Sequence, residues 1–327
     1  MKHVSILIPH GSFSLVNVEG TYQILSQVND MLRQAGGDSV FDVHLVGETR
    51  PEPLASGLFT VNPDSLLHEV TRTDLIIIPA IFGDPREVVE QNRAFIPWLL
   101  ERREQGAEIA SYCVGAFFLA ATGLLSGRQC STHWMHADEF RRLYPDVELV
   151  EDRIMTEADG IFTSGGAYSA LNLLMYIVER YAGREAAVLA SKAFMIDLDR
   201  QSQSPFIMFK TQRDHDDAVV RLVQEYIEEH YQQRLTVARL AARAGLVRRN
   251  LERRFRNATG NSVAEYVQRV KMEAAKRRLE NTSGSIFDVM EEVGYTDLKA
   301  FRRAFRKTTA LSPADYRSKY ARRSVGR

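Results

Sequence analysis

The chain has 327 residues, which is too long for one average domain, so two domains are expected. Its 42 basic and 42 acidic side chains cancel, and a hydrophobic content of 45% is ample for a packed core. Two cysteines exclude a disulfide framework, and no His/Cys cluster has metal-ligand spacing along the sequence. We therefore expect a cytoplasmic, reducing location, no bound metal and no cofactor.

Two apolar segments have the hydrophobicity of a targeting or membrane element but lack its other features. The opening run MKHVSILIPHGSF is short, is broken by Pro9 and lacks a cleavage site, so it does not resemble a signal peptide. The stretch from residue 109 to residue 125 is interrupted by Ser111, Tyr112, Gly115 and Gly123. It predicts a buried strand and helix rather than a membrane span, and no membrane partner is expected.

Short apolar runs alternate with segments of helical spacing over the first 200 residues. This alternation predicts a parallel sheet covered by helices on both faces, a flavodoxin-like three-layer sandwich. Such sheets bind ligands beyond the carboxyl ends of their strands. The expected strands are Val4–Ile8, Phe41–Val46, Leu75–Pro79, Ile109–Ser111 and Ile161–Ser164. The segments of helical spacing between and after these strands are Gly20–Ala35, Pro97–Glu104, Val114–Thr122, Asp138–Tyr144 and Ala167–Tyr181.

Cys113 is the most informative residue of this region. It stands between the strand ending at Ser111 and the helix starting near Val114, where a sharp turn would expose its side chain above the sheet. The start of the helix would favour the thiolate. His133 follows twenty residues later and is a candidate base. The alternative is that Cys113 is a buried structural thiol, as is expected of Cys130.

A ligand pocket is expected at the Cys113 turn. The backbone N–H groups of Val114 and Gly83 could bind a carboxylate or an oxyanion. Phe82, Tyr112 and Trp134 could hold a quaternary amine by cation–π contact, although a single aromatic residue is more often part of the core. The candidate pocket residues are Asn17, Phe82, Gly83, Cys113, Val114, His133 and Trp134.

The charge distribution divides the chain. Residues 1–205 hold 16 basic and 27 acidic side chains, a net charge of −11, whereas residues 206–327 hold 26 and 15, a net charge of +11. The polar segment Asp199–Thr211, broken by Pro205, separates the two halves. We expect a sensing domain at 1–205 and a domain that binds a polyanion at 206–327.

A repeat of about 50 residues lies in the basic half, where residues 236–266 resemble residues 285–316. Thr236 and Ser285 are suitable helix N-caps, and Gly245 and Gly294 suit the left-handed residue after a helix. Each copy therefore predicts a helix-turn-helix unit. The amphipathic stretch Val263–Leu279 between the copies could hold two recognition helices about one DNA turn apart.

The second helix of each unit has one apolar and one basic face. Leu251 and Phe255 in the first copy match Phe301 and Phe305 in the second, and these are expected to be buried. The opposite face suits the major groove of DNA, although a single such face is more often only solvated. The candidate DNA-contacting residues are Arg249, Asn250, Glu252, Arg253, Arg256, Lys299, Arg302, Arg303 and Arg306.

These motifs resemble two known families. Residues from about 216 to 320 resemble the DNA-binding domain of AraC/XylS regulators, with Ala310 where a glycine is common. Residues from about 3 to 195, including the Cys113 turn and SGGAYSALNLLMYIVER at 164–180, resemble the PfpI-type branch of the class I glutamine amidotransferase-like superfamily. The whole chain is similar to GlxA-like transcriptional regulators.

The resemblance implies a ligand-responsive regulator that binds specific double-stranded DNA as a homodimer. The effector would be a small amino-acid-like or quaternary amine metabolite, and RNA polymerase would be a partner if the protein activates transcription. Asn17 stands where catalytic relatives carry an acid, which implies a relic site rather than an enzyme. The alternative is a cysteine-dependent hydrolase, amidase or hydratase with a DNA-binding tail.

Overall fold

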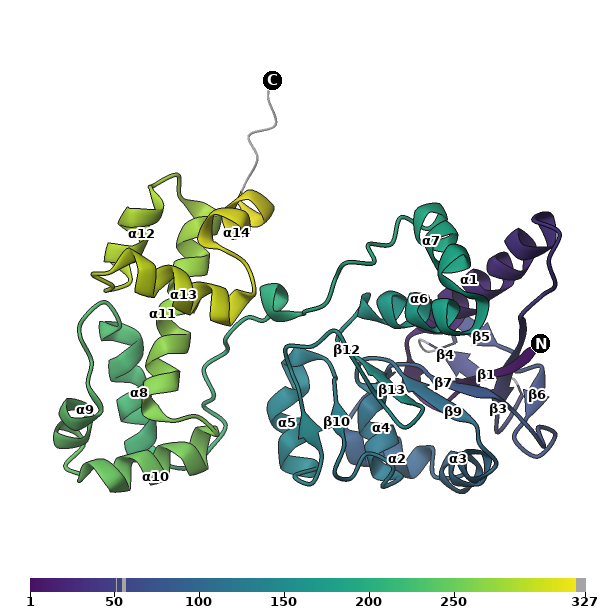
Figure 1. The fold of residues 1–327 in the computed structure, drawn as a ribbon. Helices are drawn as coiled ribbons and strands as arrows, with labels where there is room; N and C mark the ends of the chain where they lie inside the picture. Colours follow the sequence, from purple (N-terminus) through teal and green to yellow (C-terminus); the bar gives the residue numbers. More distant parts are fainter. Residues whose placement is uncertain (51, 55–56, 322–327) are drawn as a thin grey trace. The chain divides into compact units, whose positions relative to one another are not determined.

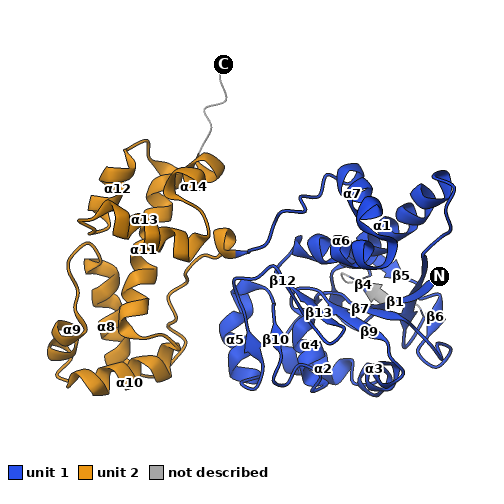
Figure 2. Cartoon of the chain, viewed as in Figure 1, with its two compact units in different colours: residues 1–203 blue, residues 204–327 orange. Residues whose placement is uncertain are grey.

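The computed structural model describes residues 1–50, 52–54 and 57–321, which form two compact units. Unit 1 is Met1–Gln203 and unit 2 is Ser204–Arg327 (Figure 2). The polar segment around Pro205 therefore contains the division. No helix in the described ranges is long and apolar enough to cross a membrane.

Unit 1 is built on a seven-stranded sheet in the order β12-β13-β9-β7-β1-β3-β6 (Figure 1). All neighbouring strands are parallel except β12 and β13. The central strands are apolar runs that are buried on both faces, as in parallel sheets generally. The strands are β1 (Lys2–Ile8), β3 (Phe41–Gly47), β6 (Ser65–Leu66), β7 (Leu75–Ile78), β9 (Glu108–Ser111), β12 (Met155–Ala158) and β13 (Ile161–Ser164).

Helices cover both faces of this sheet and bury two separate hydrophobic clusters. The predicted three-layer sandwich is confirmed. One face packs against α1 (Leu15–Gln34), α6 (Ser169–Ala182) and α7 (Arg184–Ala193). The other packs against α2 (Pro85–Gln91), α3 (Phe95–Glu104), α4 (Gly115–Ala121) and α5 (Ala137–Leu143). Further short strands pair outside the main sheet. The pairs are β2 (Ser12–Phe13) with β8 (Ile81–Phe82), β4 (Glu52–Leu54) with β5 (Phe59–Val61), and β10 (Gln129–Cys130) with β11 (Glu148–Leu149).

Some boundaries differ from the sequence-based expectation. Helix α1 begins at Leu15 rather than Gly20, because the Ser14 hydroxyl caps it by accepting a hydrogen bond from the Asn17 N–H at 3.3 Å. Helices α2 and α7 were not expected. Asp84 caps α2 through its side chain, and Gly183, with φ of 89°, separates α7 from α6.

Unit 2 contains the two helix-turn-helix motifs that the repeat predicts. The Thr236 hydroxyl accepts from the Arg239 N–H at 3.3 Å, and the Ser285 hydroxyl accepts from the Asp288 N–H at 3.1 Å, so both predicted N-caps are confirmed. Gly245 has φ of 65°, in the left-handed region. The helices are α8 (Ala218–His230), α9 (Val237–Arg243), α10 (Arg248–Thr259), α11 (Val263–Asn281), α12 (Ile286–Glu292), α13 (Leu298–Thr309) and α14 (Pro313–Tyr320).

Each helix-turn-helix unit has its own hydrophobic cluster, and the long helix α11 contributes to both. Leu251 and Phe255 anchor α10, and Phe301 and Phe305 anchor α13; all four are fully buried. The apolar faces predicted for both recognition helices are confirmed, so their opposite faces are turned away from the core.

The two recognition helices end in the same backbone conformation with different residues. Gly260 ends α10 with φ of 70°, and Ala310 ends α13 with φ of 58°. An L-amino acid is disfavoured in this left-handed region, whereas glycine adopts it freely. Ala310 is therefore a strained position in unit 2.

We expect Ala310→Gly to raise the free energy of unfolding of unit 2 by roughly 0.5–1 kcal/mol, because it removes this strain. Urea denaturation of the full chain, followed by helical circular dichroism, measures the change. Gly260→Ala is the reciprocal control. A Cβ there would meet nothing within 4 Å, so only backbone strain is added and stability should fall. A loss of stability in Ala310→Gly would contradict this account.

Candidate functional site

The Cys113 turn connects β9 to α4 at the carboxyl end of the sheet. Cys113 has φ of 55°, and its N–H donates to the Ser164 carbonyl at 3.2 Å. A Cβ on Gly115 would lie 2.4 Å from the Pro79 carbonyl oxygen, so only glycine lets α4 start this close to the end of β7. The local geometry is that of a nucleophile elbow, in which a sharp turn sets one side chain apart.

The thiol itself is poorly suited to nucleophilic attack. Cys113 is only 5% exposed, and burial raises the pKa of its thiol. The N–H groups of Ala167 and Val114 donate to the sulfur and act in the opposite direction, but burial is the larger effect. The start of the helix does act toward the thiolate through the Val114 N–H, as expected, but burial outweighs it and the net shift of the Cys113 pKa is upward.

His133 lies on the neighbouring loop and is held for a structural purpose. Its Nδ1 accepts a hydrogen bond from the Met135 N–H at 3.1 Å, which caps the short 3-10 helix η1 (Trp134–His136). Burial, with the nearby His136, lowers the pKa of His133. The ring packs on Gly166, where a Cβ would lie 2.3 Å from the ring. Within the described ranges, no hydrogen bond joins His133 to Cys113.

Asn17 ties α1 to the end of β7. Its Oδ1 accepts a hydrogen bond from the Ala80 N–H at 3.1 Å. The residue also lines a hollow of about 10 Å³ with Thr21, Tyr112 and Tyr168, which is space for one water molecule at most. Asn17 therefore joins α1 to the residues after β7, and its amide cannot serve as an acid beside the thiol.

A larger cavity of about 180 Å³ lies between β8, α2, α4 and α5. Three of the predicted pocket residues line it, namely Phe82, Gly83 and Val114, whereas Asn17, Cys113, His133 and Trp134 do not. The full lining is Ile81, Phe82, Gly83, Pro85, Val88, Val114, Phe117, His136 and Glu139.

The sequence did not single out the polar part of this lining. His136 Nδ1 lies 3.5 Å from a carboxylate oxygen of Glu139. Their separation of three residues on α5 and η1 is a local signal, but nothing in the sequence places them beside Phe82. The cavity thus combines aromatic and aliphatic walls with one carboxylate.

Gln203 joins the loops around the Cys113 turn and was also missed. The residue is 2% exposed. Its Oε1 accepts from the Gly166 N–H at 3.2 Å, and its Nε2 donates to the Thr132 carbonyl at 3.0 Å. The Thr132 hydroxyl in turn donates to the Cys113 carbonyl at 2.8 Å. One side chain from the end of unit 1 therefore fixes the loops that carry His133 and Ala167.

The segment that follows Gln203 is anchored within unit 2. It begins with the short 3-10 helix η2 (Ser204–Phe206). The Lys319 ammonium lies 4.9 Å from the centre of the Phe206 ring. The Lys276 ammonium donates to the Ile207 carbonyl at 2.5 Å. Gln203 is thus held within unit 1, and Phe206 and Ile207 are held by helices of unit 2.

The recognition helices present the predicted basic stripe. Eight of its nine residues are exposed, and the half-buried exception, Glu252, accepts a hydrogen bond from Arg248 at 3.1 Å. Arg254 lies outside the stripe and binds both carboxylate oxygens of Asp217, at 2.6 and 2.8 Å. In the described part of the chain, the exposed cations of the stripe have no ion-pair partner. These are Arg249, Arg253, Arg256, Lys299, Arg302, Arg303 and Arg306.

Comparison with known proteins agrees with this architecture. Residues 3–180 match the DJ-1/PfpI family, and residues 240–319 match a helix-turn-helix domain. The HTH-type transcriptional regulator CdhR of Pseudomonas aeruginosa is 27% identical, covering 84% of this chain and 81% of its own length. The isonitrile hydratase of Pseudomonas putida is 26% identical, covering 53% of this chain and 70% of its own.

A solved structure adds support for the fold alone. The AraC family transcriptional regulator from Pseudomonas putida has a TM-score of 0.50 and 17% identity, and the match covers 59% of this chain and all of that one. The DJ-1/PfpI match spans more than half of the present 327 residues. This protein therefore belongs to the DJ-1/PfpI family and carries an AraC-type helix-turn-helix domain at its C-terminal end.

Proposed function

We propose that this protein is a sequence-specific transcriptional regulator whose DJ-1/PfpI unit senses a small metabolite. The observation that carries the proposal is the exposed basic stripe, repeated in the same register on α10 and α13. Two such helices on one support suit successive major grooves of double-stranded DNA. The similarity to the regulator CdhR over 84% of the chain supports the same function.

The stripe divides by position on each helix. Arg253 and Arg303 lie opposite the buried Leu251/Phe255 and Phe301/Phe305 pairs, near the helix middle, where an arginine can make a bidentate contact to guanine. Arg256 and Arg306 lie nearly one turn later and suit phosphate contacts. Arg254 is excluded from base contact because its guanidinium is bound to Asp217.

The cavity beside the Cys113 turn is the best supported effector site. Phe82 and Phe117 offer aromatic walls, and Glu139 supplies one negative charge. This chemistry suits an amino-acid-like or quaternary amine effector, held by cation–π contact and by the carboxylate. We further infer that the protein works in the cytoplasm as a homodimer, and engages RNA polymerase if it activates transcription.

The state of the cysteine supports the proposal that the sensing unit is non-catalytic. The thiol is buried with a raised pKa, and His133 uses its Nδ1 to cap a helix. The rival function is a cysteine-dependent hydrolase, amidase or hydratase, which the similarity to an isonitrile hydratase favours. Iodoacetamide labelling of Cys113, followed by a turnover screen, separates the two. Rapid labelling with turnover would support the enzyme, and slow labelling without turnover supports the sensor.

Gln203 is the proposed positioning residue between effector binding and DNA binding. It holds the loops of the Cys113 turn, and the residues directly after it are held by helices of unit 2. A shift of these loops on effector binding would pull on the start of unit 2 through the main chain. Coupling between two sites of this kind is typically about 1–3 kcal/mol.

Mutation of the stripe tests the DNA-binding assignment. We expect Arg253→Ala to relax preference at one or two base positions, and Arg303→Ala to do so about ten base pairs away. Arg256→Ala and Arg306→Ala should weaken all sequences alike and lower the salt slope by about one. Selection of bound DNA at two salt concentrations measures this, with the exposed Arg277→Ala on α11 as control. Equal weakening of every sequence by Arg253→Ala and Arg303→Ala would contradict the assignment.

Mutation of the cavity tests the effector site. Glu139→Gln should weaken binding of cationic amines about tenfold, or ~1.4 kcal/mol, because the counter-charge is lost. Val88→Phe should abolish binding by filling the cavity. A thermal-shift screen of small amines and amino acids on the full chain gives the measurement. The exposed Glu104→Gln on α3 is the matched control. Binding that survives both cavity variants would place the effector elsewhere.

Mutation of Gln203 tests the coupling. Gln203→Ala should leave effector affinity and effector-free DNA affinity within about threefold of wild type, but reduce the effect of effector on DNA binding at least fivefold. DNA affinity is measured with and without the amine found in the screen. The exposed neighbour Gln201 provides the control variant Gln201→Ala. An unchanged response in Gln203→Ala would show that another path couples the units.

A further inference from the structure

A cluster of metal-ligating side chains lies on β1 and β3, at or before the middle of these strands, whereas the Cys113 turn lies at the carboxyl end of the sheet. His3 is on β1, and Asp42 and His44 are on β3. In the parallel register His3 pairs with Asp42 and Ser5 pairs with His44, so the three side chains project from one face. Their donor atoms all lie within 4.8 Å of one another. The cluster cannot be recognised from the sequence, because His3 is far along the chain from Asp42 and His44.

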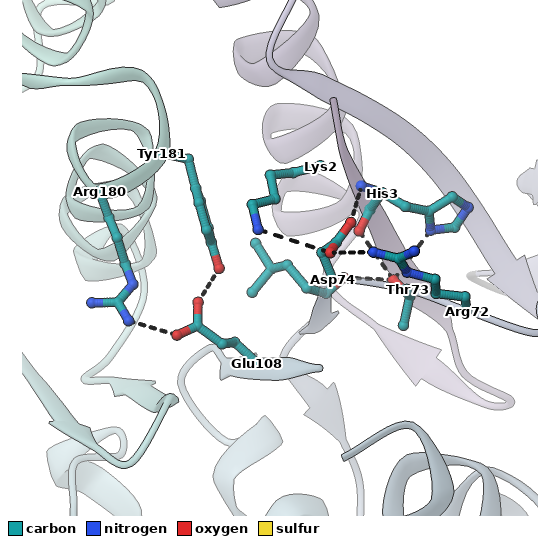
Figure 3. A network of polar contacts seen from close by, with 9 residues as sticks. Lys2, His3, Arg72, Thr73, Asp74, Glu108, Arg180 and Tyr181 are labelled. Carbon is teal, nitrogen blue, oxygen red and sulfur yellow. Dashed lines mark hydrogen bonds and ion pairs between the residues drawn. The ribbon is translucent and has the colours of Figure 1, made fainter. Parts of the chain in front are cut away.

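Hydrogen bonds around Thr73 hold the His3 ring in place. The Thr73 hydroxyl carries one hydrogen, which it donates to a backbone carbonyl, that of His3 at 3.1 Å or that of Leu75 at 3.2 Å. It accepts from the Ser5 hydroxyl at 3.0 Å, and its oxygen lies 3.2 Å from His3 Nδ1. This contact engages Nδ1 of the His3 ring, and Nε2 is then the nitrogen available as a metal ligand. Figure 3 shows His3 beside Thr73 and Asp74 at this edge.

His44 lies between two carboxylates, one at each ring nitrogen. Its Nδ1 lies 3.4 Å from an oxygen of Asp64, and its Nε2 lies 3.0 Å from an oxygen of Asp42. The other Asp64 oxygen accepts the Leu45 N–H at 3.1 Å, which holds the carboxylate in place. Metal-binding histidines usually donate their second ring nitrogen to such a carboxylate. Asp64 thus turns His44 Nε2 toward Asp42.

The charges of the cluster favour a cation. Lys2 and Arg72 lie 3.8 and 3.7 Å from Asp74, so that carboxylate already has cationic partners (Figure 3). Asp42 and Asp64 instead share the single imidazole of His44. The His3 and His44 rings are stacked with centres 4.5 Å apart, an arrangement that would be repulsive if both were protonated. The negative charge of the Asp42 and Asp64 carboxylates beside the two rings could be balanced by one divalent cation.

We propose that His3 Nε2, His44 Nε2 and the Asp42 carboxylate form a binding site for a divalent transition-metal ion such as Zn²⁺. Two imidazoles and one carboxylate suit Zn²⁺, Ni²⁺ or Cu²⁺ better than Mg²⁺ or Ca²⁺, which prefer oxygen ligands alone. Zn–N bonds of about 2.0–2.1 Å require the two stacked rings to turn toward each other, and water would complete the coordination. Asp64 and Thr73 are positioning residues.

The site is separate from the proposed effector cavity and has a different consequence. It lies where β1 and β3 begin, whereas the Cys113 turn follows the end of β9. A metal here would join two neighbouring strands of unit 1. Because the unfolded chain does not hold the ligands together, binding would stabilise the folded unit in proportion to metal concentration.

Zinc titration of the full chain without a histidine tag tests the proposal. After treatment with a chelator, isothermal titration calorimetry should show one equivalent of Zn²⁺ bound to wild type, with a higher melting temperature. His3→Asn, His44→Asn and Asp42→Asn should each weaken this binding at least a hundredfold. Asp64→Asn should weaken it about 10–100-fold, because it acts through the orientation of His44.

The exposed His68→Asn is the matched control and should bind as wild type does. Equal circular dichroism and equal metal-free melting temperatures show that each variant is folded. Should the histidine variants fail to fold, Asp64→Asn alone decides the outcome. Absence of zinc binding in wild type would overturn the proposal. Binding that persists in both His3→Asn and His44→Asn, for instance at His133 and His136, would also overturn it.

Discussion

The left-handed backbone at Cys113 is the constraint on which unit 1 depends. An alanine-like residue in this conformation costs about 1–2 kcal/mol, so the surrounding contacts must hold it. They come from separate segments: the Ser164 carbonyl, the Thr132 hydroxyl and the close approach of Gly115 to Pro79. The turn therefore brings β9, α4 and two loops to one place. Gln203 binds both loops, which makes the end of unit 1 sensitive to their positions.

The same packing that holds the turn also opposes ionisation of the Cys113 thiol. A nucleophilic cysteine needs a low pKa and a base, and burial raises the pKa of Cys113 while His133 is occupied in capping η1. The cavity beside the turn keeps what a binding site needs, namely apolar walls and one charge. These features are consistent with the sensing role proposed above for unit 1.

Sequence reasoning succeeded where the signals are local. Caps at Thr236 and Ser285, a left-handed glycine and apolar residues four apart define a helix-turn-helix within about 25 residues, and apolar runs define strands buried on both faces. The cavity depends instead on how Phe82, Val88 and Glu139 meet across three elements. His3 and His44 meet only because β1 and β3 pair in one register. Contacts of this kind, between residues far apart in the chain, produce no periodic pattern in the sequence.

The arginines of α10 differ in their surroundings, because one binds a carboxylate of the fold and the others are exposed. Arg254 makes a bidentate contact with Asp217, the residue that caps α8, and this holds the pKa of Asp217 at about 2. The stabilisation is complete above the ordinary carboxyl pKa near 3.8 and is lost only as pH falls through about 2, so it persists wherever DNA is stable. The recognition helix is thereby fixed to α8 by a charge outside the stripe. Within the described ranges Arg249, Arg253 and Arg256 are exposed and form no ion pair, which is consistent with the DNA contacts proposed for them above.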